Sequence, residues 1–369
     1  MKISTAVNQL TGCLEIVEKA LPVRSTIPVI NNILLEISQN KLIFSSTNLE
    51  MFIKVHLDHE SSENGKILLP PKIVDIMRSL PPTEVNIDIN LDNYNINIYC
   101  GSANFNLYGS NPEDYPVSFD SRINAVSGFT INKKALKKIL RMLVFAASNE
   151  ETRPAFNGIF FSFKGNILSL TSSDTYRLAY KEVKDDAWLF EEDRCLVPAR
   201  SLRELLRILD DTDGDIKMFH HSNLITFQFN GIYFASRLLE EKYPDVSGVI
   251  PGEYKTRIVI DRKKLEDTIN RAALLAEGKN QAVNLLIREK QFEATVMSPE
   301  GSMEEKIPVE QEGEDLDLFV NSRFLLDILK IIDDQKIFID FHGEGGPVIF
   351  RLLNDNSYLY LVLPIKKVN

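Results

Sequence analysis

Residues 133–147 gather basic side chains at a spacing suited to binding phosphate groups. Four cations follow the i, i+3, i+4, i+7 rule, which places side chains on one face of a helix: Lys134, Lys137, Lys138 and Arg141. The apolar residues of the stretch fall on the other face, and no acidic residue lies between positions 132 and 149. Lysine and arginine bind phosphates without reading base sequence. The stretch therefore predicts an amphipathic helix whose exposed face can contact a nucleic-acid backbone.

A second basic face is predicted on the helix expected at residues 201–209. Its cations stand opposite the apolar side chains: Arg200, Arg203 and Arg207. One such face alone is equally typical of a solvated helix, but two in one part of the chain favour a phosphate-binding surface. The sequence has no zinc-finger spacing, no helix-turn-helix signature and no aromatic platform beside these cations. The predicted contact is therefore independent of base sequence.

These basic residues stand out because the whole chain is acidic. Its 369 residues carry a formal net charge of −10. Residues 1–123 and 249–369 each carry a net charge of −5, whereas residues 124–248 are neutral. When charge is segregated in this way, the net charge of the chain says little about its partners.

The composition is that of an ordinary globular protein, with 44% hydrophobic and 25% charged residues. No apolar run approaches the ~20 residues of a membrane span, and the N-terminus lacks the apolar region of a signal peptide. The three cysteines, Cys13, Cys100 and Cys195, are far apart and show no metal-binding spacing. We therefore expect a cytoplasmic protein with free thiols.

Several other polar motifs do not predict a metal, cofactor or catalytic site. The acidic turn 210–215 has a misplaced glycine for a calcium loop, and 343–346 lacks the Lys-Ser/Thr of a phosphate loop. His220-His221 has no spaced third ligand for zinc. Ser172-Ser173-Asp174 lacks a nucleophile elbow, so Asp174 is expected to cap the following turn. We expect no catalytic residue and no cofactor.

The same helical motif recurs three times along the chain. Each copy has one acidic residue among apolar neighbours: Asp75, Glu204 and Asp327. The first two are 129 residues apart and the last two 123. A spacing of this length indicates three copies of a whole domain. The expected domains are residues 1–120, 128–251 and 252–369.

Each repeat is predicted to run β-α-ββ-β-β-α-ββ-β. Helical periodicity places the helices near 6–21, 72–80, 133–147, 201–209, 263–276 and 324–332. Two amphipathic helices on one face of a largely antiparallel sheet give an α+β fold. Because a helix buries only one stripe, its other face must meet solvent or a partner.

Several stretches resemble the bacterial sliding-clamp family, the beta subunit of DNA polymerase III. They are spread over the whole chain: Ser46-Thr47-Asn48-Leu49-Glu50-Met51, Glu151-Thr152-Arg153-Pro154, Ser173-Asp174-Thr175-Tyr176-Arg177-Leu178-Ala179, Lys242-Tyr243-Pro244-Asp245 and Leu361-Val362-Leu363-Pro364-Ile365. The resemblance implies a non-catalytic processivity factor. Two chains would close head to tail into a pseudo-sixfold dimeric ring around duplex DNA.

The resemblance also implies three sets of site residues. The cations expected to face DNA include those of the two basic helices and four more: Arg24, Lys72, Arg78 and Arg153. The dimer contact would pair Phe105 and Leu107 with Leu274 and Leu275, although these four are equally suited to a core. A groove between the second and third domains would bind Leu/Phe-containing peptides of the replicative polymerase, clamp loader and repair proteins, through Ser173, Thr175, Tyr176, Arg177, Leu178, Pro244, Val249, Asn321, Phe324, Leu361, Leu363, Pro364 and Ile365.

Alternatives remain open from the sequence alone. For the groove, Leu178, Val249 and Leu361 are equally typical of ordinary packing at a domain junction. For the function, the alternative is a clamp-fold, peptide-binding scaffold that does not encircle DNA. A weaker alternative is an enzyme acting at Ser173 and Asp174.

Overall fold

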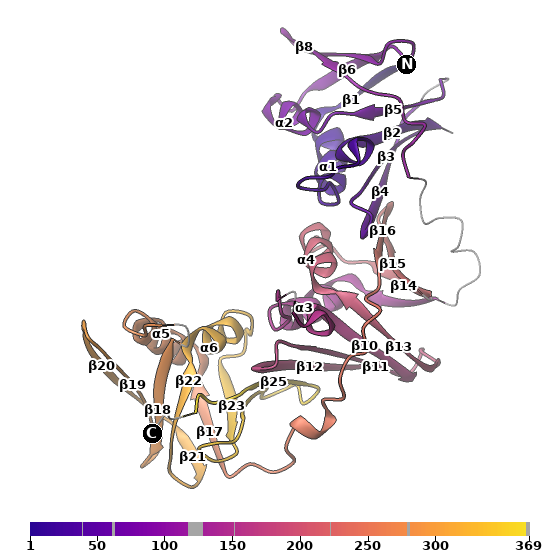
Figure 1. Cartoon of the computed structure of the whole chain (residues 1–369). Helices are drawn as coiled ribbons and strands as arrows, with labels where there is room; N and C mark the ends of the chain where they lie inside the picture. Colours follow the sequence, from indigo (N-terminus) through magenta and orange to yellow (C-terminus); the bar gives the residue numbers. More distant parts are fainter. Residues whose placement is uncertain are drawn as a thin grey trace. The chain divides into compact units, whose positions relative to one another are not determined.

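The computed structural model describes residues 1–38, 40–60, 63–116, 128–150, 152–221, 223–278 and 281–366 (Figure 1). The chain divides into two compact units. The first unit comprises Met1–Leu136 and Ser201–Leu238, and the second comprises Lys137–Arg200 and Leu239–Asn369. Each unit contains one long sheet and one four-stranded sheet.

The first unit is built on an eight-stranded sheet with the order β5-β2-β3-β4-β16-β15-β14-β9 and a four-stranded sheet with the order β1-β6-β7-β8. The strands are β1 (Lys2–Ala6), β2 (Ile33–Ser38), β3 (Lys41–Thr47), β4 (Met51–Asp58), β5 (Gly65–Leu69), β6 (Glu84–Ile89), β7 (Asn95–Cys100), β8 (Ala103–Tyr108), β9 (Gly128–Asn132), β14 (Asp215–His221), β15 (Leu224–Phe229) and β16 (Ile232–Arg237).

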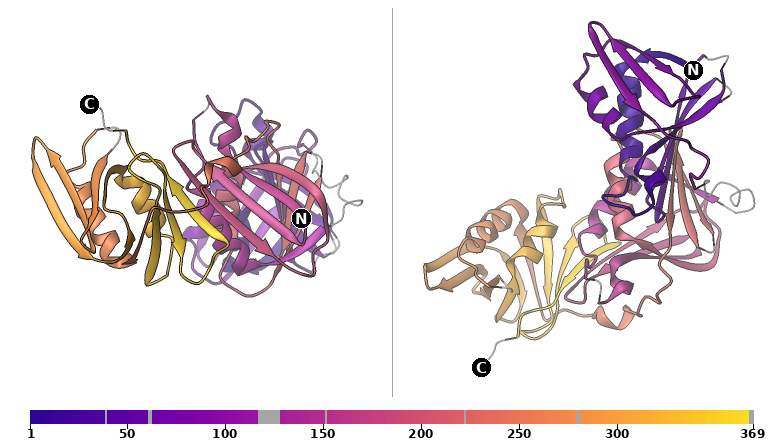
Figure 2. Two further views of the ribbon diagram at one scale, coloured as in Figure 1. Left: turned by 90° about the horizontal axis from the view of Figure 1, so that it is seen from below. Right: turned by 45° about the horizontal axis from the view of Figure 1, so that its top comes forward.

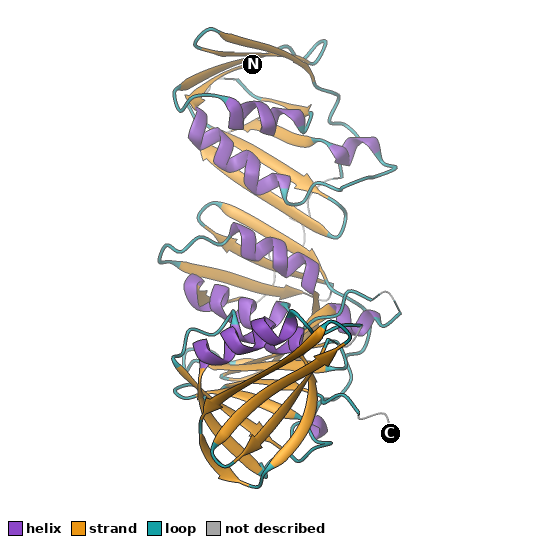
Figure 3. Ribbon diagram, turned by 90° about the vertical axis from the view of Figure 1, so that its left-hand side faces the viewer, coloured by secondary structure: helices purple, strands orange, loops and turns teal. Residues whose placement is uncertain are grey.

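Helices α1 (Val7–Glu18) and α2 (Lys72–Ser79) lie side by side in this unit, and α1 packs on β3 and β4 (Figure 3). The buried stripe of α1 is Leu10, Leu14 and Val17, at the spacing expected for one helix face. The middle third of the chain supplies α3 (Lys133–Val144) and α4 (Ala199–Ile208), whose residues are divided between the two units.

The second unit has a nine-stranded sheet with the order β13-β10-β11-β12-β25-β24-β23-β17-β21 and a four-stranded sheet with the order β20-β19-β18-β22 (Figure 2). Its helices α5 (Arg262–Ala273) and α6 (Ser322–Leu329) contact each other. The strands are β10 (Gly158–Gly165), β11 (Ile167–Ser173), β12 (Arg177–Lys184), β13 (Phe190–Pro198), β17 (Thr256–Asp261), β18 (Ala282–Arg288), β19 (Gln291–Ser298), β20 (Gly301–Pro308), β21 (Glu310–Gly313), β22 (Leu316–Asn321), β23 (Lys336–Phe341), β24 (Val348–Leu352) and β25 (Tyr358–Val362).

The element order predicted from the sequence is confirmed in the first two repeats, and the third repeat adds only β21. The named strand pairings are antiparallel, which confirms the α+β class. The helices are shorter than predicted at their C-terminal ends. Ala20 and Ala147 lie beyond the ends of α1 and α3 but are still buried, so the apolar periodicity continues past the last helical turn.

The repeats join through strand pairing, which the sequence did not predict. β4 of the first repeat pairs with β16 of the second, so that Ile53 lies opposite Phe234. β12 of the second repeat pairs with β25 of the third, so that Ala179 lies opposite Tyr360. The boundary expected at residue 120 lies outside the described residues.

Candidate nucleic-acid and peptide interfaces

The basic face of α3 presents cations at the protein surface. Lys134, Lys138 and Arg141 are exposed, and Lys137 is half-buried. Lys134 pairs with Asp213, with 2.8 Å between its Nζ and the carboxylate oxygen. Lys138 and Arg141 have no ion-pair partner within the described ranges. The sequence prediction of an exposed cationic face on this helix is therefore confirmed, and two of its charges are available to an external anion.

Lys133, the first residue of α3, is buried and has a different role. Its Nζ donates to Thr212 Oγ1 at 2.5 Å and lies 2.5 Å from Asp210 Oδ1. Hydrogen bonds from Lys133 and then from Thr212 lower the pKa of Asp210 to about 2. The acidic turn 210–215 thus anchors the start of α3. Its charges are used in holding the helix, in agreement with the sequence reading of a turn that follows α4.

The polar face of α4 is less uniform than its sequence suggests. Arg200 is exposed and has no ion-pair partner in the described part of the chain, whereas Arg207 donates to Glu204 at 2.7 Å. Arg203 is half-buried, and burial followed by the charge of Arg207 lowers its pKa. Only Arg200 on this helix combines exposure with freedom from a carboxylate.

The other predicted DNA-facing cations are distributed over the fold. Arg24 is exposed in the loop after α1. Lys72 pairs with Asp75 within α2, and Arg78 pairs with carboxylates of α1. Arg153 instead donates from Nη1 to Thr175 Oγ1 at 3.0 Å, so it adjoins a predicted peptide-site residue.

The turn between β11 and β12 is held by side-chain hydrogen bonds. Asp174 Oδ1 accepts from the backbone N–H groups of Tyr176 and Arg177, each at 3.0 Å, which confirms the predicted capping role. Ser173 Oγ donates to the carbonyl of Arg177 at 2.7 Å and accepts from the N–H of Thr175 at 3.1 Å. Because the Ser173 hydroxyl is buried and engaged in the turn, it is unsuited to act as a nucleophile.

Arg177 links three segments of the second unit. Its Nε donates to Asp174 at 2.9 Å, its Nη1 to Asp327 of α6 at 2.6 Å, and its Nη2 to the carbonyl of Phe145 at 2.8 Å. The guanidinium also lies 4.5 Å from the centre of the Phe324 ring. Planar, multidentate bonding of this kind is a property of arginine that lysine lacks. Arg177 is therefore a positioning residue that fixes the turn against α6.

The predicted peptide-site residues gather around this turn. The N–H of Leu363 donates to the carbonyl of Tyr176 at 2.9 Å, and that of Ile365 donates to the carbonyl of Phe319 at 2.7 Å. Three apolar side chains remain exposed: Tyr176 at 60%, Val249 at 46% and Leu363 at 38%. Leu178 and Leu361 are buried in a cluster with Ile349 and Leu359, and Val246 and Ile250, on either side of Val249 in the sequence, pack against this cluster.

The remaining predicted residues of this site have other positions. Asn321 caps α6 by accepting from the N–H of Arg323 at 2.9 Å, and Pro244 is exposed beside the buried Tyr243. The Tyr243 ring stacks on Phe160 with centroids 5.1 Å apart. Pro364 is half-buried after β25.

The four predicted dimer residues lie near sheet edges or a helix end. Phe105 and Leu107 are half-buried on β8, the last strand of its sheet. Leu274 and Leu275 follow α5, and Leu274 is 81% exposed. β20 is the corresponding outer strand of the other four-stranded sheet. An exposed strand edge offers unpaired backbone groups to a second chain.

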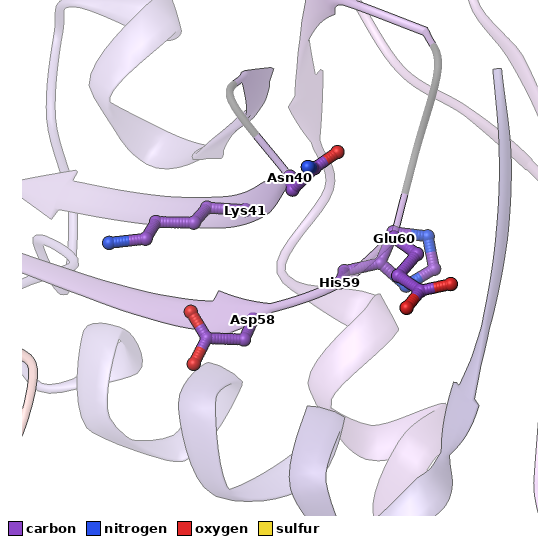
Figure 4. Close-up of a pocket in the computed structure, with 5 residues that line it drawn as sticks. All are labelled: Asn40, Lys41, Asp58, His59 and Glu60. Carbon is purple, nitrogen blue, oxygen red and sulfur yellow. The ribbon is translucent and has the colours of Figure 1, made fainter.

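Within the described ranges no group of three or more His, Cys, Asp or Glu side chains could hold a metal ion. A pocket where β3 begins and β4 ends is lined by Asn40, Lys41, Asp58, His59 and Glu60 (Figure 4). Among those same ranges, no helix is long and apolar enough to cross a membrane.

Three models of one protein family match the chain in succession. They describe the DNA polymerase III beta subunit: its N-terminal domain at residues 1–119, its central domain at 130–245 and its C-terminal domain at 247–366. The beta sliding clamp of Staphylococcus epidermidis is 32% identical over 375 residues, which cover 98% of this chain and 97% of that protein. The beta sliding clamp of Staphylococcus aureus is 31% identical over 94% of both chains.

Solved structures agree with these sequence matches. The DNA polymerase sliding clamp from Bacillus subtilis superimposes with a TM-score of 0.93 at 30% identity, with complete coverage of both chains. Threefold α+β repeats with cationic helices and an apolar turn surface define a ring-clamp type of binding protein. The chain belongs to the DNA polymerase III beta subunit family, the bacterial sliding clamps. Its function is that of a non-catalytic processivity factor, as the sequence resemblance implied.

We predict that the Arg177–Asp327 contact stabilises the second unit. Arg177→Met leaves two carboxylates and a carbonyl without their donor, so it should lower the free energy of unfolding by about 2 kcal/mol. Asp327→Asn should cost about 1 kcal/mol, and the double variant should cost about 1 kcal/mol less than the sum. Urea unfolding followed by circular dichroism measures all three. Arg323→Met, at an exposed α6 site, is the control. If the costs of Arg177→Met and Asp327→Asn were simply additive in the double variant, the two side chains would not be energetically coupled.

We also predict that the charged Asp210 carboxylate stabilises the fold near neutral pH and that this stabilisation is lost in acid. Its pKa of about 2 lies below the ordinary value of 3.8, so the charged form is favoured in the folded state. The stability that it contributes is complete above pH ~4 and is lost as the pH falls toward 2. Asp210→Asn should therefore flatten the decline of the melting temperature between pH 4.5 and 2.5. Asp92→Asn, in the exposed β6–β7 turn, should retain the wild-type decline; identical acid profiles for all three proteins would refute the role of Asp210.

Proposed function

We propose that two copies of this clamp close head to tail around duplex DNA, with the helices of all three domains facing the duplex. The proposal depends on three exposed cations of α3 and α4 that have no carboxylate partner in the described ranges: Lys138, Arg141 and Arg200. They stand out because the chain as a whole is acidic. Family membership supplies the ring. The proposed domain limits are 1–120, 128–251 and 252–369.

Few and weak phosphate contacts suit this function. Each phosphate contact adds affinity that depends on salt but not on sequence, so a small number lets a protein move along DNA. Retention then comes from the closed ring rather than from affinity. The cations that we propose to lie on the DNA-facing side are the three above with Arg24, Lys72, Arg78, Lys134, Lys137, Arg203 and Arg207. Of these, Lys72, Arg78, Lys134 and Arg207 are already paired with carboxylates of the chain. Arg153, which contacts Thr175, is proposed only as a peripheral member.

The proposed dimer contact joins β8 of one protomer to β20 of its partner. Two internal junctions suggest the register. β3–β4 and β11–β12 each pair residues five apart at the hairpin end, and β19–β20 has the corresponding five-apart pair, Met297–Ser302, one step before its hairpin end. Matching these pairs aligns Ile53, Ala179 and Met303. The β15–β16 and β7–β8 hairpins align Phe234 with Phe105. Because Ile53 lies opposite Phe234, Met303 is proposed to lie opposite the partner's Phe105, with Leu107, Leu274 and Leu275 nearby.

The proposed partner site is the surface around Tyr176, Val249 and Leu363, supported by the buried Leu178 and Leu361. Exposed apolar side chains gathered on one surface suit a short peptide with Leu or Phe. Ser173, Thr175, Arg177, Asn321 and Phe324 hold the turn and α6 in place, and Pro244, Pro364 and Ile365 border the surface. We propose that the polymerase, clamp loader and repair proteins use this site, in the cytoplasm where the nucleoid is replicated.

The ring predicts retention that depends on DNA topology. After loading by a bacterial clamp loader with ATP, the clamp should stay on a nicked circular plasmid through gel filtration and leave once the plasmid is linearised. Lys138→Glu with Arg141→Glu should lower loading about tenfold, because two phosphate contacts become repulsive. Lys164→Glu with Lys184→Glu, on exposed strand positions, is the control. Equal dissociation from circular and linear plasmid would favour a scaffold that does not encircle DNA.

The proposed register predicts a specific cross-link between protomers. Met303→Cys with Phe105→Cys places two thiols directly opposite across an antiparallel pair, within the range of a disulfide. Mild oxidation should yield a covalent dimer on a non-reducing gel. Met303→Cys with Asn104→Cys is the matched control, because neighbouring strand residues point to opposite faces. Faster cross-linking of the control pair would show that the register is shifted.

A further inference from the structure

Arg78, near the end of α2, is held by carboxylates of the neighbouring helix α1. Its Nε donates to Glu15 at 2.8 Å, and its Nη2 and Nη1 donate to the two carboxylate oxygens of Glu18 at 2.6 and 3.4 Å. Asp75, one turn earlier in α2, places an oxygen 3.8 Å from Nη1. The Arg78 side chain is 38% exposed, so this cluster lies at the surface and is accessible to a large anion.

The Glu15 and Glu18 carboxylates occupy the donors that a DNA phosphate would use. A guanidinium binds carboxylate and phosphate oxygens through the same planar fork of N–H groups. The cluster holds Arg78 and three carboxylates, and Lys72 pairs with Asp75 at 2.9 Å, so two cations and three carboxylates leave a formal charge of −1 with every group ionised. A phosphate that approached Arg78 would have to displace Glu15 or Glu18 and would meet the charge of Asp75.

The internal repeat shows that this charge arrangement is particular to the first domain. The buried positions Leu14 of α1, Leu140 of α3 and Ile269 of α5 align the first helices of the three repeats. The same alignment places Glu15 where α3 has the exposed Arg141 and where α5 has Asn270. One helical position is therefore acidic in the first domain, basic in the second and neutral in the third.

We propose that Glu15 and Glu18 act as intramolecular substitutes for DNA phosphates, which keep Arg78 from contacting the duplex. This inference rests on the proposed function, in which the helix faces meet DNA. The first domain then contributes fewer phosphate contacts than its cations suggest, and α3 and α4 of the second domain contribute more. Glu15 and Glu18 set how strongly the clamp holds the DNA backbone.

The test is the salt dependence of binding to an open duplex. The full-length clamp is titrated onto a fluorescent 30-base-pair linear duplex, and anisotropy gives the association constant between about 50 and 150 mM NaCl. Each phosphate contact adds about 0.9 to the slope of log K against log salt, which is an extra fall of about 2.7-fold over this range. Glu15→Gln with Glu18→Gln should steepen the slope by one such contact and strengthen binding at 50 mM NaCl.

Two further variants assign the gain to Arg78. Adding Arg78→Gln to the double variant should return the slope to that of the wild type, whereas Arg78→Gln alone should leave it unchanged. Glu240→Gln with Glu241→Gln removes the same charge from two exposed loop residues and should not alter the slope. Any of three results would overturn the proposal. These are a wild-type slope in the Glu15/Glu18 variant, a steeper slope that persists in that variant when Arg78→Gln is added, and an equally steepened slope in the Glu240/Glu241 variant.

Failure of this inference is distinguishable from failure of the proposed ring. Retention on the nicked circular plasmid is measured in parallel for the wild type. If the wild type is retained but the Glu15/Glu18 variant has the wild-type slope, the substitution role is wrong and the ring stands. If the wild type leaves circular and linear DNA equally, the proposed encirclement is wrong.

Discussion

The backbone groups at a sheet edge need hydrogen-bond partners, and this requirement governs how the three repeats are joined. β4 and β12 would each be an exposed edge if its repeat folded alone. β16 covers β4 and β25 covers β12, which gives sheets of eight and nine strands that each combine two repeats. The junctions are hydrogen-bonded ladders rather than flexible linkers. β8 and β20 are two of the end strands of the described sheets, and they are the two that we propose to pair with a second chain.

Both internal junctions contain the same kind of backbone turn, and the two turns differ only in their side chains. Leu49 and Thr175 both adopt a positive φ, of 74° and 78°. Asn48 caps its turn through two backbone N–H groups, as Asp174 does. The next residue of the pattern differs, because Arg177 stands where the first junction has Met51. Arg177 draws Asp327 and Phe324 to the turn, and Tyr176 and Leu363 lie exposed beside it. The proposed partner surface is thus formed by side chains that are particular to the second junction, on a backbone turn that both junctions share.

The sequence predicted the repeat, the six helices and the cationic face of α3, because each depends on local periodicity. It predicted a strand after the third repeat's hairpin but assigned no residues to β20, because Met303-Glu304-Glu305-Lys306 is polar and most of this strand is exposed. Pairing between repeats also escaped prediction, because register is set by long-range contacts. Periodicity placed Lys133 at the start of a helix, but only tertiary contact with Thr212 and Asp210 shows that it is buried and structural.

The carboxylates around Arg78 have a consequence for clamps that are not yet on DNA. A chromosome offers roughly 10⁶–10⁹ sites to any protein with an affinity for backbone phosphate. A clamp with many uncompensated cations would adsorb to the outside of that DNA and would be lost to the loader. Glu15 and Glu18 pair with Arg78, and under the role proposed for them they would reduce the affinity of the unloaded protein for the exterior of the chromosome. The internal ion pairs thereby help to maintain a free pool from which rings are drawn.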